Sequence, residues 1–497
     1  MKKGSGLSRT MERRDFLKGV VGVGGAAMLP HSFAAQEMRR PNVVYVFADQ
    51  WRASAMGYAG DPNVKTPHLD RLAAESFNFE NAVSVCPVCS PARASMITGQ
   101  YPLTHGVFVN DVCLDQDGQS IADCFNLAGY KTGYIGKWHL DGHGRSAYIP
   151  EERRQGFKFW QALECTHNYN HSQYYDNDDP EIQMWKGYDA YDQTTHAIDY
   201  IHNNRENPFV LFLSWGPPHA PYMTAPEKFR NMYDPEKLEL PPNVSDEEAF
   251  KASSKWDEYS KLDPIDRVRH IMAGYYAHCS ALDACVGRLQ AAIREAGLEN
   301  DTIFVFTSDH GDMLGSHGLW KKQWPYDESA CVPFLLKFPG FGQSGRDIET
   351  PINTPDIMPT LLDLCGVSLP SSVQGKSRVQ EMNGRETPEE AVLIANVHPF
   401  GQWDAGRGGK EWRGVRTAQY TYVRDLDGPW LLFDNKKDPY QMKNLIGNPE
   451  SKPLQKRMET LLQKKLSDTN DRFEPGMNYV RQRGYPVDET GTVPYAN

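Results

Sequence analysis

The sequence predicts an α/β fold: a mixed, mostly parallel sheet between helices, followed by a smaller C-terminal antiparallel sheet plus helix. Several short runs rich in β-branched and aromatic residues are typical of strands that are buried on both faces. Stretches with helical spacing separate these runs, and this alternation favours a layered α/β domain. After about Ser368 the chain changes to short alternating strands with turns between them, which indicates an antiparallel meander.

Apolar runs define the predicted strands of the main sheet, and polar residues follow each run. The runs cover residues 42–48, 131–135, 209–214 and 302–307. The polar residues that follow them are Asp49, the segment 136–139, the segment 217–219 and Asp309. Because chemistry in parallel sheets collects at the carboxyl ends of the strands, we expect these residues to lie at one edge. Helices are predicted at residues 67–76 and 275–296.

The C-terminal unit has its own predicted elements. Strands are expected at residues 411–416, 420–425 and 430–434, with a helix at 452–466. A charged, loop-like segment at residues 236–263 is interpreted either as an insertion bordering a substrate cleft or as a solvated surface excursion.

Composition limits the classes of function. The 497 residues are 40% hydrophobic and 24% charged, which is enough to bury one large core and a smaller one. The net charge of −11 argues against nucleic-acid binding, because phosphate neutralisation requires a basic face. It does not exclude an anionic substrate, since a local cluster of cations can be positive on an acidic protein.

The first 35 residues predict a twin-arginine export signal. Arg13 and Arg14 precede a glycine-rich apolar stretch at residues 19–29 and a small-residue cleavage site at 32–34. The alternative is a chance arginine pair before a buried helix. The apolar stretch is too short to span a bilayer, so we expect no stable membrane insertion. Transport by the twin-arginine translocase to a periplasmic or secreted location is therefore expected.

Cys89 begins the run CSPARASMITG, which fits the site at which a cysteine is oxidised to formylglycine. In a hydrated aldehyde one hydroxyl can attack an ester, and deprotonation of the second later expels the product. Arg93 follows four positions later and faces the same side if the segment is helical. Cys86 forms a C-x-x-C unit with Cys89, and the alternatives are a redox pair or half of a zinc site. The other cysteines permit disulfides whose pairing the sequence does not reveal.

Two strand ends supply a predicted metal site. Asp49, Gln50 and Asp309 offer oxygen ligands and His310 an imidazole, and hydrated formylglycine at position 89 would add another oxygen. An oxygen-rich set suits Ca²⁺, whereas the imidazole favours Mn²⁺ or Zn²⁺.

Three further motifs complete a family pattern. They are GKWHL at residues 136–140, PPH at 217–219 and WKKQWPYDES at 320–329. With the Cys89 run, they resemble the type I, formylglycine-dependent sulfatases of the alkaline-phosphatase-like superfamily, and most closely the bacterial carbohydrate sulfatases. The resemblance extends from Asn42 to about Asn448. It implies an alkaline-phosphatase-like α/β sandwich, with a catalytic domain at residues 36–368 and a C-terminal subdomain at 369–497.

The resemblance also implies roles for individual residues. Arg93 and Lys137 would hold the nucleophile and the sulfate, and His139 would take a proton from the second hydroxyl of the diol. His219 and Lys322 would bind sulfate and protonate the leaving oxygen.

The implied metal is one Ca²⁺ per chain, bound by Asp49, Gln50, modified Cys89, Asp309 and His310. Many family members instead have Asp at the position of Gln50 and Asn at that of His310. Lys321 is an adjacent competitor for the role of Lys322. Cys331 stands where the family often has Arg.

The expected function is sulfuric ester hydrolysis, with release of sulfate from sulfated carbohydrates. Maturation would need a formylglycine-generating enzyme or an anaerobic sulfatase-maturating enzyme. The alternatives are a phosphonate or phosphate ester hydrolase and a catalytically silent binder of sulfated glycans. Candidate substrate contacts are Asn110, Asp111, His143, Arg145, His398, Trp403, Arg407 and Arg413, for each of which ordinary surface exposure is the alternative.

Overall fold

β1 (Asn42–Asp49) lies inside a ten-stranded sheet and pairs in parallel with β8 (Phe209–Pro218) and β9 (Thr302–Ser308). β4 (Lys131–Lys137) pairs in parallel with the other edge of β8. These are the four strands that the sequence predicts, each extended by a few residues. The computed structural model describes residues 40–115, 118–244, 262–342, 345–388 and 390–494. The predicted export signal at 1–35 and most of the charged segment at 236–263 lie outside the described residues.

The sheet is parallel in its centre, with antiparallel pairs on both sides and one further parallel pair at the β11 edge. Its order is β11-β2-β10-β9-β1-β8-β4-β5-β6-β7. The remaining strands are β11 (Arg346–Ile348), β2 (Phe77–Phe79), β10 (Phe334–Lys337), β5 (Phe159–Leu163), β6 (Gln173–Asp176) and β7 (Gln183–Met184). A separate parallel pair joins β3 (Ala82–Val83) to β12 (Ile352–Asn353). The predicted mixed, mostly parallel sheet is confirmed.

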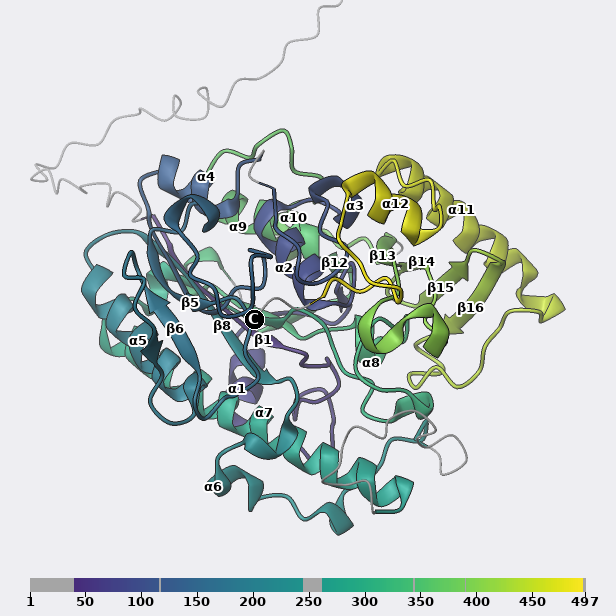
Figure 1. Cartoon of the computed structure of the whole chain (residues 1–497), viewed down its shortest axis with the longest axis horizontal. Coiled ribbons are helices and arrows are strands. Elements are labelled where there is room, and N and C mark those ends of the chain that lie inside the picture. Colours follow the sequence, from purple (N-terminus) through teal and green to yellow (C-terminus); the bar gives the residue numbers. More distant parts are fainter. Residues whose placement is uncertain (1–39, 116–117, 245–261, 343–344, 389, 495–497) are drawn as a thin grey trace, which may run out of the picture. The chain divides into compact units, whose positions relative to one another are not determined.

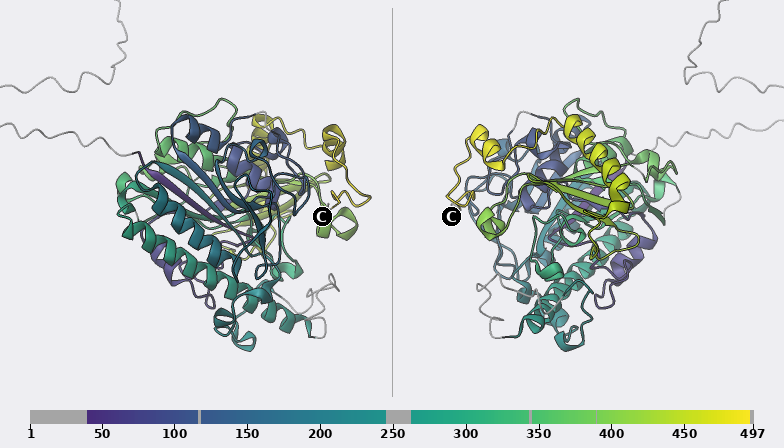
Figure 2. Two further views of the ribbon diagram at one scale, coloured as in Figure 1. Left: turned by 60° about the vertical axis from the view of Figure 1, so that its left-hand side comes forward. Right: turned by 90° about the vertical axis from the view of Figure 1, so that its right-hand side faces the viewer.

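Alternating side chains of β1 divide the core into two layers. Val44 and Val46 pack with α1 (Pro67–Ala74), α5 (Asp189–Asn204) and α7 (Pro264–Glu295). Tyr45 and Phe47 pack on the opposite face with α2 (Cys89–Thr98), α4 (Ile121–Leu127) and α9 (Ile357–Leu364). Successive side chains of a strand point to opposite faces, so one apolar strand serves both layers. Figures 1 and 2 show the sheet between these helices.

The helix predicted at 275–296 is α7, which begins earlier, at Pro264. Proline is favoured at the first helical position because its missing N–H has no partner there in any case. The short helices are α3 (Pro102–His105), α6 (Glu227–Arg230), α8 (Asp327–Ala330), α10 (Val379–Met382) and α12 (Gly476–Arg483).

The C-terminal antiparallel sheet has four strands rather than the three that the sequence predicts. They are β13 (Val392–Asn396), β14 (Trp412–Arg416), β15 (Tyr420–Asp425) and β16 (Gly428–Asp434). β13 was missed because a short apolar run has no period that separates strand from helix. On one face, α11 (Lys452–Asp468) buries Met458, Leu462 and Leu466 against the sheet.

The C-terminal sheet is bonded to the rest of the chain, since the Ala395 N–H donates to the Val85 carbonyl at 2.8 Å. The boundary near residue 368 stays a prediction. All nine cysteines lie in the described residues, and all are free thiols. No helix in the described part of the chain combines the length and apolarity that a membrane span needs.

Candidate active site

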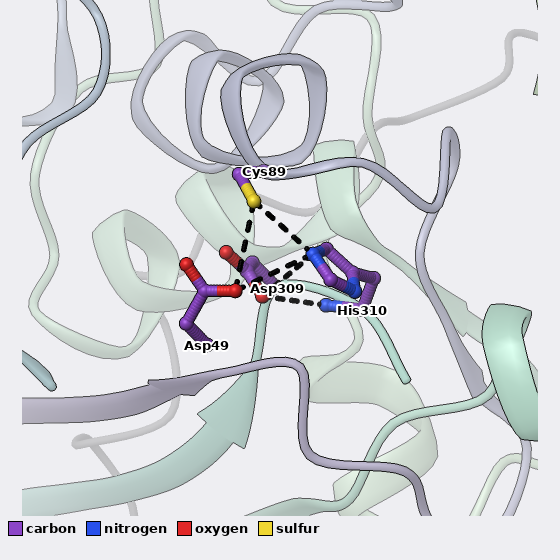
Figure 3. Close-up of side chains that lie close together, drawn as sticks. All are labelled: Asp49, Cys89, Asp309 and His310. Carbon is purple, nitrogen blue, oxygen red and sulfur yellow. Dashed lines mark hydrogen bonds and ion pairs between the residues drawn. The ribbon is translucent and has the colours of Figure 1, made fainter. Parts of the chain in front are cut away.

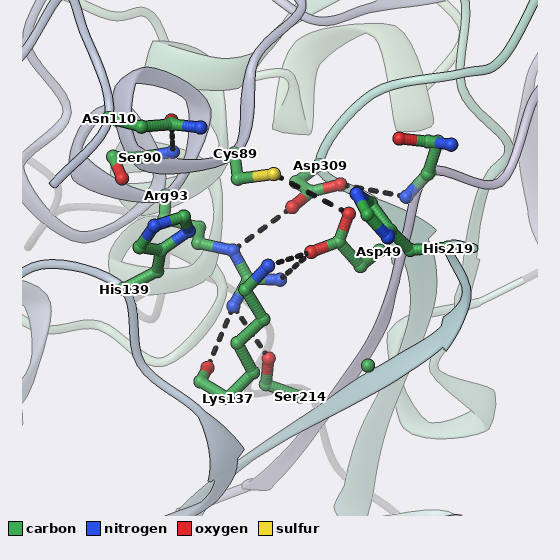
Figure 4. Close-up of polar contacts among 12 residues, drawn as sticks. Asp49, Cys89, Ser90, Arg93, Asn110, Lys137, His139, Ser214, His219 and Asp309 are labelled. Carbon is green, nitrogen blue, oxygen red and sulfur yellow. Dashed lines mark hydrogen bonds and ion pairs between the residues drawn. The ribbon is translucent and has the colours of Figure 1, made fainter. Parts of the chain in front are cut away.

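Four strand ends bring the predicted polar residues to one edge of the sheet. Asp49 ends β1 and Lys137 ends β4, while Asp309 and His219 each follow the last residue of their strand directly. Figure 4 shows these side chains converging beneath the first turn of α2. The polar residues that the sequence places at the strand ends therefore do meet at one edge of the sheet.

Cys89 is the first residue of α2, at the helix end where unpaired N–H groups favour negative charge. Its Sγ atom is buried and lies 2.8 Å from Lys322 Nζ, 3.3 Å from His310 Nε2 and 3.6 Å from Asp49 Oδ1. Burial and Asp49 act to raise the pKa of this thiol. Lys137, Lys322 and His310 outweigh them and hold the pKa well below its usual range.

A buried cluster beside Cys89 fits a divalent cation. Ligand atoms of Asp49, Cys89, Asp309 and His310 all lie within 4.8 Å of one another (Figure 3). Burial and the neighbouring Asp49 carboxylate raise the pKa of Asp309. Burial also acts to raise the pKa of Asp49, but Lys137 and the other nearby cations outweigh it and hold that pKa well below its usual range. Oxygen atoms with one imidazole suit a hard or borderline divalent ion.

Gln50 places a side-chain oxygen that also suits a cation. Its side-chain nitrogen donates to Asp312 Oδ2 at 2.6 Å, whereas its buried Oε1 has no hydrogen-bond partner. An unpaired buried acceptor costs about 1–3 kcal/mol, which a cation would remove. The residues present therefore fit the metal ion that the site implies.

Arg93 lies one helical turn after Cys89, and its guanidinium braces the two carboxylates. It bonds Asp309 Oδ2 at 3.0 Å and Asp49 Oδ2 at 3.3 Å. It also donates to the Lys137 carbonyl and to Ser214 Oγ. Arg93 does not line the cavity described below, so its expected contact with sulfate stays a prediction.

Lys137 and His139 both line the cavity, although not through a continued strand. β4 ends at Lys137, and His139 has a positive φ of 60°. Lys137 Nζ forms an ion pair with Asp49, and His139 Nε2 lies 3.4 Å from Asp111 Oδ1. Gly136 (φ 105°) lets the strand approach β8, because a Cβ there would lie 2.0 Å from the Ser214 carbonyl oxygen.

The cavity beside Cys89 is also lined by two imidazoles and a lysine pair. His219 donates from Nδ1 to the Ala220 carbonyl at 2.8 Å and stacks on His167 at 4.5 Å between ring centres. Burial, Lys322 and His167 hold the pKa of His219 well below its usual range. Lys322 is the lysine that reaches Cys89, while burial and Lys322 lower the pKa of Lys321 to about 8.

These residues surround a cavity of about 350 Å³ that opens above Cys89. Four of the candidate substrate contacts line it: Asn110, Asp111, Arg145 and Trp403. A larger cavity of about 670 Å³ lies elsewhere and includes none of the predicted catalytic residues, so we assign no chemistry to it.

The other four candidate contacts are corrected by the structure, because each lies outside the cavity. His143 is half-exposed and bonds the Asp141 carbonyl, and His398 bonds the Gly491 carbonyl. Arg407 is exposed, and Arg413 is buried in an ion pair with Asp471.

Sequence reasoning missed several residues that line the cavity: His167, Gln323, Gln402, Thr492 and Val493. Gln323 lies inside the predicted motif at residues 320–329, whereas no motif marks the other four. A backbone signal accompanies Gln323 and several predicted site residues, because Gln50, Asp111, His139, Lys321 and Gln323 have positive φ values. That conformation is unfavourable for non-glycine residues and tends to cluster at functional sites.

A buried low-pKa cysteine beside a carboxylate pair and two lysines defines a hydrolase of anionic esters on an alkaline-phosphatase-like fold. The chain belongs to the sulfatase family: the sulfatase family model matches residues 41–367. The model of the C-terminal part of N-sulphoglucosamine sulphohydrolase matches residues 315–468. The protein is therefore a sulfuric ester hydrolase.

Individual relatives agree with the family. An ulvan-active sulfatase of Formosa agariphila is 45% identical over 456 residues, covering 90% of this chain and 85% of that protein. A structure solved in work on glycosaminoglycan metabolism by Bacteroides thetaiotaomicron has a TM-score of 0.76 and 28% identity, covering 90% and 100%. A phosphonate monoester hydrolase of Silicibacter pomeroyi has a TM-score of 0.71 and 26% identity, covering 87% and 96%.

Proposed function

We propose that this protein releases sulfate from sulfated carbohydrates, using formylglycine formed at Cys89 and one calcium ion. The observation that carries the proposal is the setting of Cys89, which lies at the floor of the cavity between two lysines and the carboxylate cluster. Hydrated formylglycine supplies a hydroxyl nucleophile and a second hydroxyl whose deprotonation regenerates the aldehyde. Asp49, Gln50, Asp309 and His310 would bind Ca²⁺, which supplies positive charge for the nucleophile and for sulfate oxygens.

The chain's own cations would orient the ester. Lys137 and Lys322 line the same cavity as Cys89, so their ammonium groups would bind sulfate oxygens and offset the charge that develops on them. Arg93 keeps Asp49 and Asp309 in place from beneath, and thus acts on the nucleophile indirectly.

Two proton transfers fall to different residues. His139 accepts a proton at the nucleophile side, and the Asp111 carboxylate stabilises the resulting imidazolium. On the leaving-group side, His219 and Lys322 both line the cavity. This pair would bind sulfate and protonate the leaving oxygen.

Carbohydrate is the proposed substrate class because the ulvan-active relative covers nearly the whole chain. The cavity also mixes aromatic, amide and cationic side chains, which suits a hydroxylated anionic ligand.

The protein would reach the periplasm or the medium through the twin-arginine translocase after removal of residues 1–35. Sequencing the N-terminus of the mature protein tests this, and a mature chain that starts at Met1 would contradict it. A formylglycine-generating or anaerobic sulfatase-maturating enzyme would convert Cys89, which peptide mass spectrometry of natively matured protein detects.

The decisive experiment measures free sulfate from aldehyde-bearing protein given ulvan oligosaccharides, glycosaminoglycan disaccharides and 4-nitrophenyl sulfate. We expect sulfate release from at least one saccharide. A phosphate monoester dianion needs more positive compensation than a sulfate monoanion, so a sulfatase site should hydrolyse the sulfate ester faster. A higher kcat/KM for 4-nitrophenyl phosphate or a phenyl phosphonate than for the matched sulfate would therefore favour the phosphoester alternative. No turnover by protein with verified formylglycine would favour the silent binder.

A further inference from the structure

We infer that the C-terminal segment at residues 484–494 is a specificity wall of the active-site cavity, which binds the sugar part of the substrate. This inference rests on the proposed carbohydrate sulfatase function. Residues 469–494 lie beyond both matched family models, which end at residues 367 and 468. Thr492 and Val493 nevertheless line the same cavity as Cys89 and Lys322. Figure 1 shows the chain returning from α12 toward the carboxyl ends of the central strands.

The segment is fixed in place by contacts along its length. Near its start, the Tyr485 hydroxyl donates to the Gly106 carbonyl at 2.6 Å. Asp488 then closes a turn, because its Oδ1 accepts the N–H groups of Thr490 and Thr492 at 2.9 and 3.0 Å. Val493 is buried and belongs to the same apolar cluster as the helices above the sheet. A wall that is held at both ends can position a ligand group.

The end of the segment also holds a second lining loop, residues 401–403. The Gly401 N–H donates to Thr492 Oγ1 at 2.7 Å. His398 Nε2 donates to the Gly491 carbonyl at 3.1 Å. Gly491 has a φ of 77°, and a Cβ there would lie 2.2 Å from His398 Nε2, so glycine is required for this contact. The segment and the loop thus form one surface.

The chemistry of this surface differs from that of the cavity floor. Around Cys89 the cavity presents Lys137, Lys321, Lys322 and Arg145, which suit sulfate. The wall presents no charged side chain among the described residues that line the cavity: Phe400, Gly401, Gln402, Trp403, Thr492 and Val493. Aromatic and aliphatic faces beside an amide and a hydroxyl match a pyranose ring, which has apolar C–H faces and neutral hydroxyls.

The wall should therefore discriminate between a sugar sulfate and an aryl sulfate. Both esters use the cationic floor, but only the sugar has hydroxyl groups that the wall can bond. Thr492 Oγ1 accepts the Gly401 N–H and bonds Thr490 Oγ1, which leaves it one acceptor position for a sugar hydroxyl, and the Gln402 amide offers both a donor and an acceptor. Sites that hydrogen-bond a substrate hydroxyl discriminate strongly against analogues that lack it.

The test compares kcat/KM for ulvan oligosaccharides, or for the best saccharide of the panel above, with kcat/KM for 4-nitrophenyl sulfate. Deletion of residues 486–497 should lower the saccharide-to-aryl ratio about tenfold or more, and Thr492→Val should lower it about fivefold, mainly through KM of the saccharide. Thr460→Val, an exposed threonine that bonds the Lys456 carbonyl on α11, should leave the ratio and both rates unchanged.

Equal loss of both activities in the deletion and in Thr492→Val would overturn the inference, because it would make the segment a purely structural support. If the deleted chain does not fold, Thr492→Val and Gly491→Ala decide the question, with melting temperature as the check on folding. Wild-type turnover of 4-nitrophenyl sulfate without turnover of any saccharide would refute the carbohydrate assignment and this inference together. Absence of both activities would instead refute the proposed catalytic function.

Discussion

Cys86 and Cys89 are three residues apart and have opposite surroundings. Burial in the apolar layer around α2 and α9 raises the pKa of the Cys86 thiol to about 12. Cys89 lies among cations that hold its pKa low. Among the described residues, Cys86 also belongs to no group of possible metal ligands, so the redox and zinc alternatives lack support. Cys86 packs in the core, whereas Cys89 lies among the cations of the candidate site, where we propose that formylglycine forms.

Replacing these two cysteines separates the roles. Cys89→Ala should lower kcat/KM for 4-nitrophenyl sulfate by more than about a thousandfold, because the nucleophile cannot form. Cys86→Ala removes one sulfur from the core and should retain sulfatase activity at a cost of about 1 kcal/mol in unfolding free energy. Denaturant unfolding and sulfate release measure both quantities. A kcat/KM of Cys89→Ala equal to that of the wild type would contradict the assignment of Cys89 as the nucleophile position.

The pH dependence of the reaction should report on Asp111. Burial lowers the pKa of His139, but Cys165 and the hydrogen bond to Asp111 raise it to about 9. If His139 accepts a proton, activity rises with pH as the imidazole loses its own proton. Asp111→Asn removes the negative partner, so the pKa of His139 falls and the acidic limb of the kcat profile should move down by roughly one pH unit.

The control for this shift is Asp178→Asn, which removes an exposed carboxylate that pairs with Arg154 outside the cavity. It should leave the kcat profile in place. An acidic limb that stays or moves upward in Asp111→Asn would show that His139 is not the group that titrates.

At the scale of elements, the segment that carries Lys322 is held by the C-terminal part of the chain. The Gln323 side chain donates to the Phe400 carbonyl at 3.0 Å and accepts the Phe400 N–H at 3.3 Å. The Gln323 carbonyl accepts the Trp412 indole N–H of β14 at 2.9 Å. The antiparallel sheet thus supports a catalytic loop as well as covering the core.

Gln323→Ala should therefore lower kcat by roughly tenfold to a hundredfold, because a displacement of about 1 Å in a catalytic group has effects of this size. Gln374→Ala removes a comparable side-chain bond, to the Tyr101 N–H at 2.9 Å, away from the active-site cavity. It should cost similar stability without loss of kcat. Equal kcat in the two variants would refute the coupling.

At the scale of the whole molecule, metal binding should contribute to folding stability as well as to catalysis. Asp49 and Asp309 come from strands whose ends adjoin only in the folded chain, so a cation that binds both favours the native state. Ligand at a hundred times its dissociation constant adds about 2.7 kcal/mol.

Chelation followed by dialysis should abolish sulfatase activity and lower the melting temperature by a few degrees, and Ca²⁺ should restore both. Re-addition of Mn²⁺ or Zn²⁺ tests whether His310 selects a softer ion. His143→Ala alters the second group of possible ligands, Cys113, Asp141 and His143, and should leave the response unchanged. Asp309→Asn should abolish the effect of chelation and of added Ca²⁺ on the melting temperature. Full activity and an unchanged melting temperature after chelation would refute the metal site.

Much of the fold was predictable because the signals are local. Apolar runs in the sequence indicate the buried strands, and the polar residues that follow parallel strands meet at one sheet edge. The proximity of Asp49, Asp309 and His310 follows from this rule, whereas their role as metal ligands stays a prediction. The rule did not predict β13 or the antiparallel strands β10 and β2, since pairing between distant short runs has no local signature.

The sequence by itself determined the main strands, the polar residues that follow them and the Cys89 motif, because residue type and spacing carry that information. The structure decided between Lys321 and Lys322, since Lys322 Nζ is the one that reaches Cys89 Sγ. Only the tertiary structure decided that Arg93 braces carboxylates, that Gln50 leaves its oxygen unpaired, and that Thr492 reaches the cavity. Those outcomes depend on side-chain direction and on contacts between segments hundreds of residues apart, which the covalent order of residues does not encode locally.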